Sequence, residues 1–217
     1  MHSKRIREKI KEDYNAIASE FSDTRRFPWK EFDAFLPYYR SDFSVLDLGC
    51  GNGRLLTFLE KYGYSDYLGV DQAGALLNLA RQAWPKAEFL EADMAELNLE
   101  QRFDALFAIA SFHHLPPEDR LATLKKWRTF LKPGGVLFMT NWNLYQRRFW
   151  PLWWRAFLSR INPWASGLPI LWKGQQERTY FPLTGRELKK LLRQAGFTVL
   201  EQSSCLRGAN LITIVQA

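Results

Sequence analysis

The chain has 217 residues, enough to bury a sizeable core without a disulfide or a metal. Its two cysteines form no C-x-x-C pair and it has three histidines, so we expect no metal site. The charged start lacks the apolar stretch of a secretory signal, and no run approaches the ~20 apolar residues that span a bilayer. These features predict a cytoplasmic protein without stable membrane insertion. The net charge of +7 favours anionic partners.

A polar helical pattern covers residues 5–20, and strand and helix patterns alternate after it. Short apolar runs predict buried strands at Ser44–Leu48, Tyr67–Val70, Glu88–Leu90, Phe103–Ala110 and Val136–Thr140. Helical stretches lie between them at Gly53–Lys61, Ala73–Ala83 and Glu118–Leu131. Such alternation is typical of a doubly wound α/β fold, in which helices cover both faces of a mostly parallel sheet.

The last part of the chain predicts a helix at Gly185–Ala195 and two strands, Phe197–Gln202 and Asn210–Gln216. Their short connection indicates an antiparallel hairpin at one edge of the sheet. The segment Asn141–Phe181 interrupts the alternation and holds six of the nine tryptophans. We interpret it as a helical insertion over the carboxyl ends of the strands, where such folds bind their ligands. We therefore expect one domain over 1–217, with 1–40 as an N-terminal helical cap and 141–181 as an aromatic insertion or lid.

The glycine-rich segment Val45–Gly53 ends a predicted strand and opens a predicted helix. Glycine lets the backbone turn tightly and approach a ligand closely, because no Cβ stands in the way. The spacing is G-x-G-x-G, and Asp47 lies two residues before the first glycine. A carboxylate there would repel the pyrophosphate of a dinucleotide, whereas it suits a ligand with a cationic amino group. The motif therefore favours S-adenosylmethionine (SAM) over a nicotinamide dinucleotide, although a tight structural turn would also use these glycines.

Two further acidic residues follow the next two predicted strands. Asp71 ends a strand where a carboxylate can accept both hydroxyls of a ribose, and its alternative role is a helix cap before Ala73. Asp93 follows the third strand and can accept the amino group of an adenine, with Met94 as an apolar contact. Three acids after three successive strands, behind a G-x-G-x-G loop, predict a SAM site.

These elements resemble the class I SAM-dependent methyltransferases, and Leu131–Leu137 is similar to that superfamily's turn before the fifth strand. The resemblance covers about Phe43 to Leu137. It implies the strand order 3-2-1-4-5-7-6 and places Ala110 to His113 beside the methionine end of the cofactor. The expected cofactor-binding residues are Asp47, Gly49, Cys50, Gly51, Asn52, Gly53, Asp71, Gln72, Asp93, Met94, Ala110 and His113.

The segment Tyr14–Trp29 matches the pattern Y-x-x-I-A-x-x-F-S-x-T-R-x-x-P-W at every fixed position. It resembles the tRNA wobble-uridine carboxymethyl methyltransferases, which esterify a carboxylate in the anticodon. Ile109–His114 and, less closely, Met139–Trp142 are similar to that family as well. The later stretch departs from the family, which usually has an aspartate ahead of an adjacent Pro-Trp pair. In this chain the proline and the tryptophan of Leu168–Trp172 are separated from each other. Arg178–Phe181 keeps an arginine and a tyrosine but lacks the family's histidine.

The resemblance implies transfer of a methyl group to a carboxylate, which is ionised at neutral pH and needs no general base. Such a site needs a cation to position the carboxylate, and a guanidinium binds it bidentately. Arg25 is our candidate, with Arg178 in reserve; Arg25 and Arg26 are alternatively a solvated basic pair. If the acceptor were a hydroxyl or an amine, a histidine would be the natural base. The expected catalytic residues are Arg25 and His114.

The expected substrate-binding residues are Tyr14, Arg25, Trp29, His114, Asn141, Trp142 and Arg178. For Tyr14 and Trp29 the alternative is that they only pin the N-terminal helix to the core. The leading hypothesis is methylation of a modified uridine carboxylate in tRNA. The alternatives are an O- or N-methyltransferase of a small or lipid-like molecule and a non-catalytic subunit that binds RNA or a partner. The need for an activating subunit stays open.

The aromatic insertion carries an apolar helical stripe accompanied by arginines. The stripe consists of Trp150, Trp153, Trp154, Phe157, Leu158 and Ile161. Three interpretations compete: a lid packed over the core, an RNA surface with stacking aromatics, and an interfacial helix on an anionic membrane.

Overall fold

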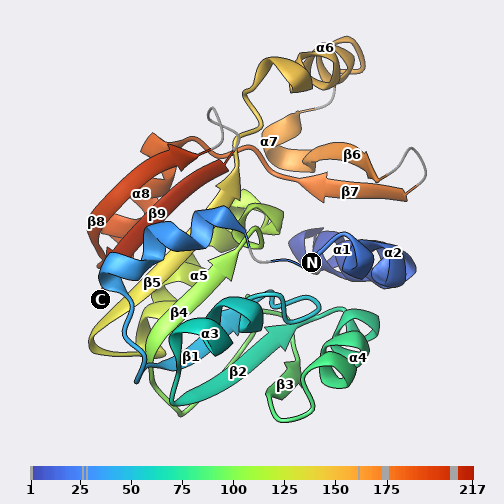
Figure 1. The fold of residues 1–217 in the computed structure, drawn as a ribbon. Coiled ribbons are helices and arrows are strands. Elements are labelled where there is room, and N and C mark those ends of the chain that lie inside the picture. The colour runs from blue at the N-terminus through green and yellow to red at the C-terminus, as the bar shows by residue number, and fades with distance from the viewer. Residues whose placement is uncertain (1, 26, 28, 161, 173–175, 206–209) are drawn as a thin grey trace.

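The structure is a computed structural model that describes residues 2–25, 27, 29–160, 162–172, 176–205 and 210–217. Its centre is a seven-stranded sheet with the order β3-β2-β1-β4-β5-β9-β8 (Figure 1). The strands are β1 (Ser44–Leu48), β2 (Asp66–Asp71), β3 (Glu88–Glu91), β4 (Phe103–Ile109), β5 (Leu131–Trp142), β8 (Thr198–Cys205) and β9 (Asn210–Gln216). The first five are parallel and β9 is antiparallel to both neighbours. The expected α/β fold, its strand order and the terminal hairpin are confirmed.

Alternating side chains of the central strands form two cores, one on each face of the sheet. Val45, Phe107 and Phe138 point to one face, where they pack beneath η1 (Lys30–Tyr38) and α3 (Leu56–Tyr62). Leu46, Leu106 and Leu137 point to the other face, beneath α5 (Pro117–Thr129) and α8 (Gly185–Gln194). This period of two buries both faces of the sheet, as a doubly wound fold requires.

The expectation that β3 is a buried strand was wrong. Its residues are exposed or half-buried, and Leu90 is 38% exposed. The reason is its place in the sheet, because β3 pairs only with β2 and forms one edge. The adjoining helix α4 (Gly74–Ala83) packs against β2 and β3.

The N-terminal segment forms α1 (His2–Ala16) and α2 (Ala18–Asp23), which lie beside α4 and the strand β7 (Gln176–Tyr180) (Figure 1). The insertion after β5 contains η3 (Arg147–Phe149), α6 (Trp150–Leu158), α7 (Pro163–Ser166) and an antiparallel pair of β7 with β6 (Leu168–Trp172). The prediction of a purely helical insertion therefore missed this hairpin. Each of its strands has only five residues, too few to show a clear period in the sequence.

The aromatic stripe of α6 is not packed over the core. Trp150, Trp154, Phe157 and Leu158 are 52–76% exposed, and Trp153 alone among the described members is half-buried. Ile161 lies outside the described residues, as do Arg26 and Pro28 of the N-terminal motif. The described helices include none that is long and apolar enough to cross a bilayer.

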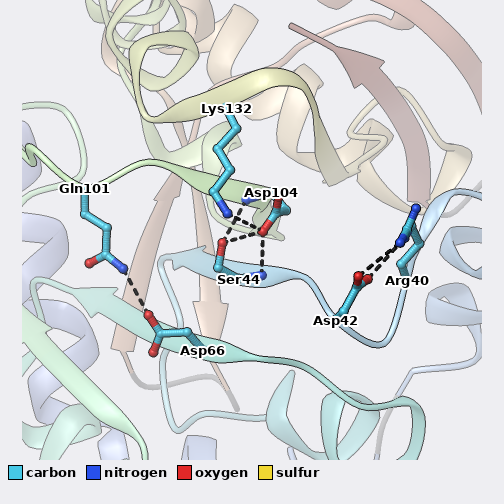
Figure 2. A network of polar contacts seen from close by, with 7 residues as sticks. All are labelled: Arg40, Asp42, Ser44, Asp66, Gln101, Asp104 and Lys132. Atoms are coloured by element: carbon cyan, nitrogen blue, oxygen red, sulfur yellow. Dashed lines mark hydrogen bonds and ion pairs between the residues drawn. The ribbon is translucent and has the colours of Figure 1, made fainter.

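Polar contacts join the strands where they begin, at the edge of the sheet opposite the carboxyl ends (Figure 2). Asp104, at the start of β4, accepts hydrogen bonds from the backbone and hydroxyl of Ser44 at 2.9 and 2.6 Å. Lys132 forms an ion pair with the same carboxylate at 2.7 Å. These contacts fix the register of β1, β4 and β5 and leave the carboxyl ends of the strands to form a site.

Candidate active site

One pocket lies at the carboxyl ends of β1, β2 and β4, beneath α1 and the segment that follows α2. It brings together most of the residues expected from the sequence. Those that line it are Tyr14, Arg25, Trp29, Asp47, Gly49, Cys50, Gly51, Asn52, Asp71, Gln72, Asp93, Met94, Ala110, His113, His114, Trp142 and Arg178.

Two expected residues do not line this pocket. Gly53 has a φ of +78°, and a side chain at its position would meet the ring of Trp84. It therefore serves the turn that leads into α3. Asn141 is fully buried in β5, and neither atom of its side-chain amide has a hydrogen-bond partner among the described residues.

The glycine loop is fixed to the end of β2 by one carboxylate. Gly51, at a φ of +58°, donates its backbone N–H to Asp71 at 2.8 Å, and Ala73 donates to the other oxygen at 2.8 Å. A Cβ on Gly49 would overlap the Ser111 side chain, whereas a Cβ on Gly51 would enter open space. Asp71 thus caps the turn before α4, and its remaining lone pairs can still accept the hydroxyls of a ribose.

Asp47 has an incomplete set of partners. One carboxylate oxygen accepts a hydrogen bond from the Tyr67 hydroxyl at 3.1 Å, and the other is buried without a partner among the described residues. Burial raises the pKa of Asp47 to about 7. A buried oxygen on the wall of a pocket indicates a cationic or hydrogen-bonding ligand beside it, because an unsatisfied buried acceptor is costly.

Asp93 is engaged by a residue that the sequence analysis missed. Arg7 of α1 donates to Asp93 at 2.6 Å and to Glu96 at 2.7 Å, and it also forms an ion pair with Asp119. Arg7 is buried and lines the pocket together with Asp93. The contact holds α1 next to Asp93, the third of the predicted cofactor-binding acids. It joins residues 86 positions apart, so no local pattern could have revealed it.

Arg178 occupies the opposite end of the pocket. It is 3% exposed, and its guanidinium lies 4.7 Å from the ring centre of Trp172, 5.3 Å from Tyr180 and 5.7 Å from Trp142. Its Nε has no hydrogen-bond partner, and none of the ion pairs among the described residues includes it. A buried cation without a carboxylate among the described residues can pair with an anion that enters the pocket, and the aromatic rings around it stabilise its charge.

Two more guanidinium groups line the pocket. Arg25 is half-buried, lies 4.6 Å from the ring centre of Phe21 and 5.5 Å from that of Trp172, and donates to the Thr24 hydroxyl at 2.7 Å. Burial lowers the pKa of Arg25, and the charge of Arg178 lowers it further. Arg54, directly after the glycine loop, lies 4.0 Å from the ring centre of Trp29, and burial lowers its pKa to about 9. Its position next to the motif was the clue that sequence reasoning overlooked.

His114 is locked into a chain of hydrogen bonds. Its Nδ1 lies 2.7 Å from the carbonyl oxygen of Thr179, which can only accept, so this nitrogen carries the hydrogen. Its Nε2 therefore accepts from the Tyr14 hydroxyl at 2.9 Å. Burial lowers the pKa of His114 to about 4. His114 thus holds Tyr14 in place and has no nitrogen left to take a proton from a substrate.

His113 is neutral and directed by the backbone. Its Nδ1 accepts the N–H of Trp142 at 3.2 Å, so the hydrogen of the neutral ring lies on Nε2, which is buried without a partner. Burial lowers the pKa of His113 well below its usual value. The ring contributes an N–H donor to this end of the pocket rather than a base.

The chain is similar in sequence and in fold to known methyltransferases. Residues 45–135 match the model of a methyltransferase domain family. A protein of Encephalitozoon cuniculi that bears the name methyltransferase is 31% identical to this chain, over 88% of this chain and 88% of its own length. A solved SAM-dependent methyltransferase of Methanosarcina mazei has a TM-score of 0.69 at 22% identity, over 84% of this chain and 96% of that chain.

Two kinds of relative carry a more specific name. A tRNA (carboxymethyluridine(34)-5-O)-methyltransferase of Arabidopsis thaliana is 34% identical over 59% of this chain and 31% of that protein. A trans-aconitate 2-methyltransferase of Rhizobium rhizogenes is 35% identical over 54% of this chain and 45% of that protein. The chain thus spans about a third and about half of these relatives.

The fold and the site define an enzyme that transfers a methyl group from SAM. The chain belongs to the class I SAM-dependent methyltransferases. The residues of the pocket fit this cofactor: the unpartnered oxygen of Asp47 suits its amino group, Asp71 its ribose, and the space at Gly51 allows close approach of its methionine part. SAM supplies an electrophilic methyl group on a cationic sulfur.

Proposed function

We propose that this methyltransferase esterifies a carboxylate, namely that of a carboxymethyl-type modified uridine at the wobble position of tRNA. The observation that carries the proposal is Arg178, a buried cation in the pocket without an acidic partner among the described residues. A carboxylate that entered the pocket would provide the missing anion and could accept two parallel hydrogen bonds from the guanidinium.

The histidines support a carboxylate over a hydroxyl or an amine. A neutral hydroxyl or a protonated amine must lose a proton, and that step calls for a base whose pKa is near the working pH. Both nitrogens of His114 are used and its pKa is about 4, while His113 offers only an N–H donor. A carboxylate is already ionised, so the pocket needs only to hold it in line with the methyl group.

The residues of this chain divide the work in the proposed reaction. Asp47 and Asp71 hold the donor, and Arg178 with Arg25 turns one carboxylate oxygen toward the methyl group. Tyr14, fixed by His114, borders the same space. The aromatic rings of Trp142, Trp172 and Tyr180 exclude water from Arg178. An ionised carboxylate held in this way would need no residue of the chain to take up a proton when SAM supplies its methyl group.

Three observations support tRNA as the carrier of this carboxylate. The Tyr14–Trp29 motif resembles the tRNA wobble-uridine family, and the structure supplies Tyr14, Arg25 and Trp29 of that motif to the pocket wall. The Arabidopsis relative bears the corresponding name. The excess of 30 basic over 23 acidic residues favours a polyanionic substrate.

The test is incubation of the enzyme with labelled SAM and tRNA that bears 5-carboxymethyluridine. We expect a methyl ester that alkali removes; a label that resists alkali, or no transfer, contradicts the proposal. A small free carboxylic acid is the second candidate, favoured by the trans-aconitate relative. Transfer to trans-aconitate at a higher kcat/KM than to the modified tRNA would select it.

A further inference from the structure

The outer surface of the insertion carries an aromatic groove, formed by Tyr145, Trp150, Trp153, Trp154 and Phe157. Its volume is about 460 Å³, within the roughly 300–1,000 Å³ that small-ligand sites occupy. The rings of Tyr145 and Trp153 stack with centres 5.3 Å apart, and those of Trp154 and Phe157 meet edge to face at 5.9 Å. All five residues that line the groove are aromatic, and none of them belongs to the methyl-transfer pocket.

The charged residues of the segment that forms most of the groove have one sign. No aspartate or glutamate occurs from Asn143 to Gln176, whereas four arginines of this segment are exposed. These are Arg147, Arg148, Arg155 and Arg160. Arg147 lies 5.5 Å from the ring centre of Trp150 at the rim of the groove. The surface therefore complements a partner that combines negative charge with flat or apolar groups.

The groove is attached next to the acceptor end of the pocket, which is the end that holds Arg178 and Arg25. On its inner side, Ala156 and Phe149 pack with Leu144 and Leu168 in a small core. Trp153 donates its indole N–H to the carbonyl oxygen of Leu144 at 2.8 Å. Trp142 and Tyr180 belong to the same core and also line the pocket. A ligand in the groove and a substrate beside Arg178 thus rest on opposite sides of one packed unit.

We infer that the aromatic groove binds unpaired nucleotides of the RNA substrate, those next to the nucleotide that enters the pocket. This inference rests on the proposed function, because it takes the acceptor to be part of an RNA. Stacking of bases on aromatic rings, together with arginines along the phosphates, is how proteins hold single strands without reading their sequence. Figure 1 shows α6 at the outer end of the insertion, beyond β6, on the side of the sheet where β5 ends.

The groove favours RNA over a lipid surface. A helix that lies on a membrane presents an apolar stripe to the bilayer. Here Tyr145, outside α6, also lines the groove, so the aromatic surface forms a hollow rather than a single stripe along the helix. A flat bilayer surface leaves such a hollow unfilled.

The test uses a fluorescein-labelled anticodon stem-loop RNA with an unmodified wobble uridine, so that binding is measured without methyl transfer. We expect the Trp154→Ala/Phe157→Ala variant to bind it about tenfold or more weakly by fluorescence anisotropy. Both side chains are 64% or more exposed, so the variant keeps its fold. The matched control is Leu200→Ala, an exposed apolar residue of β8, which leaves the affinity unchanged. For the Arg147→Ala/Arg155→Ala variant, we expect a plot of the logarithm of the RNA affinity against the logarithm of salt concentration to be less steep. Its slope should decrease in magnitude by roughly 0.7 for each lost phosphate contact.

Failure of the inference is distinct from failure of the proposed function. Equal RNA binding by the wild type and the Trp154→Ala/Phe157→Ala variant overturns the inference, even where methyl transfer to the modified tRNA succeeds. Binding of the wild type, but not the variant, to phosphatidylglycerol vesicles together with unchanged RNA affinity assigns the groove to a lipid surface. A dimer that this variant alone loses, again with unchanged RNA affinity, assigns it to a second copy of the chain.

Discussion

The two ends of the methyl-transfer pocket have opposite electrostatic character. At the cofactor end, three acidic residues line the pocket: Asp47 and Asp71 lie at the carboxyl ends of β1 and β2, and Asp93 lies just beyond β3. At the acceptor end, the described residues contribute no acid to the wall, and Arg178 and Arg25 lie among aromatic rings. The cofactor end therefore suits a cationic donor, and in the proposed function the acceptor end receives an anion.

The difference explains how one pocket can accelerate the proposed reaction. A cationic sulfur and a carboxylate react to give two neutral products, so charge disappears as the new bond forms. Removal of water lowers the barrier, because the charged reactants lose more solvation than a transition state in which their charges are partly neutralised. Among the described residues, Asp47 and Arg178 are buried groups of opposite sign with incomplete sets of partners, and in the proposed reaction each pairs with one reactant.

The largest expected effect is at the acceptor end. Replacement of Arg178→Met should lower kcat/KM for the carboxylate substrate by about 100-fold, because a buried charge-assisted pair is lost. The Tm should stay equal or rise, since an apolar side chain replaces a buried cation that has no acidic partner. Isothermal calorimetry should show unchanged SAM affinity. A large fall in Tm together with normal activity would assign Arg178 a structural role instead.

The next effect is at the cofactor end. Asp47→Asn should weaken SAM binding by about tenfold, since the neutral amide no longer attracts the amino group, while Tyr67 can still donate to its oxygen. In the cofactor-free protein at pH 8 the same variant should be more stable by at least ~1 kcal/mol, or roughly 2–4 °C in Tm. The wild type buries an ionised carboxylate there, and the variant does not. We therefore expect weaker SAM binding, measured by calorimetry, together with a higher Tm, measured by thermal unfolding.

The pH dependence follows from the same carboxyl group. The pKa of Asp47 is about 7 in the folded protein and near its usual value when unfolded, so the free energy of unfolding decreases as pH rises through this interval. SAM binding requires the ionised form, and affinity should therefore increase from pH 5.5 to 8 with release of up to one proton. Calorimetry in buffers of different ionisation enthalpy measures this release. Asp47→Asn is the control and should abolish it.

Arg25→Ala should have a smaller effect than the change at Arg178. We expect it to lower kcat/KM about tenfold, mainly because KM for the carboxylate substrate rises. The reason is its partial exposure, which lets solvent screen the charge. Steady-state kinetics on both variants tests the ranking. If Arg25→Ala costs more than Arg178→Met, the sequence-based choice of Arg25 as the principal cation is correct.

The smallest effect is expected at His114. Glutamine there can accept from Tyr14, so His114→Gln should lower kcat by less than about fivefold and leave its pH profile between 6 and 9 unchanged at saturating SAM. A general base would instead contribute roughly 100-fold or more. A loss of that size, with disappearance of an inflection in the profile, would contradict the assignment of His114 as a positioning residue.

The sequence predicted the sheet and the cofactor end well, because both depend on local patterns. Short apolar runs located the strands, and parallel strands bring their carboxyl ends to one edge, so Asp47, Asp71 and Asp93 were expected to converge. The acceptor end depends on long-range packing. The aromatic rings around Arg178 are brought together by the hairpin of β6 and β7. The ion pair of Arg7 with Asp93 joins residues 86 positions apart. Neither leaves a periodic trace in the chain.

The most direct test of the account compares two tRNA substrates that differ only in charge at the acceptor. One bears 5-carboxymethyluridine at the wobble position and the other bears the corresponding carboxamide, which has nearly the same shape. The account predicts an alkali-labile methyl ester on the acid and no transfer to the amide. Equal methylation of both would contradict it, because an acceptor end built around Arg178 must distinguish an anion from a neutral group.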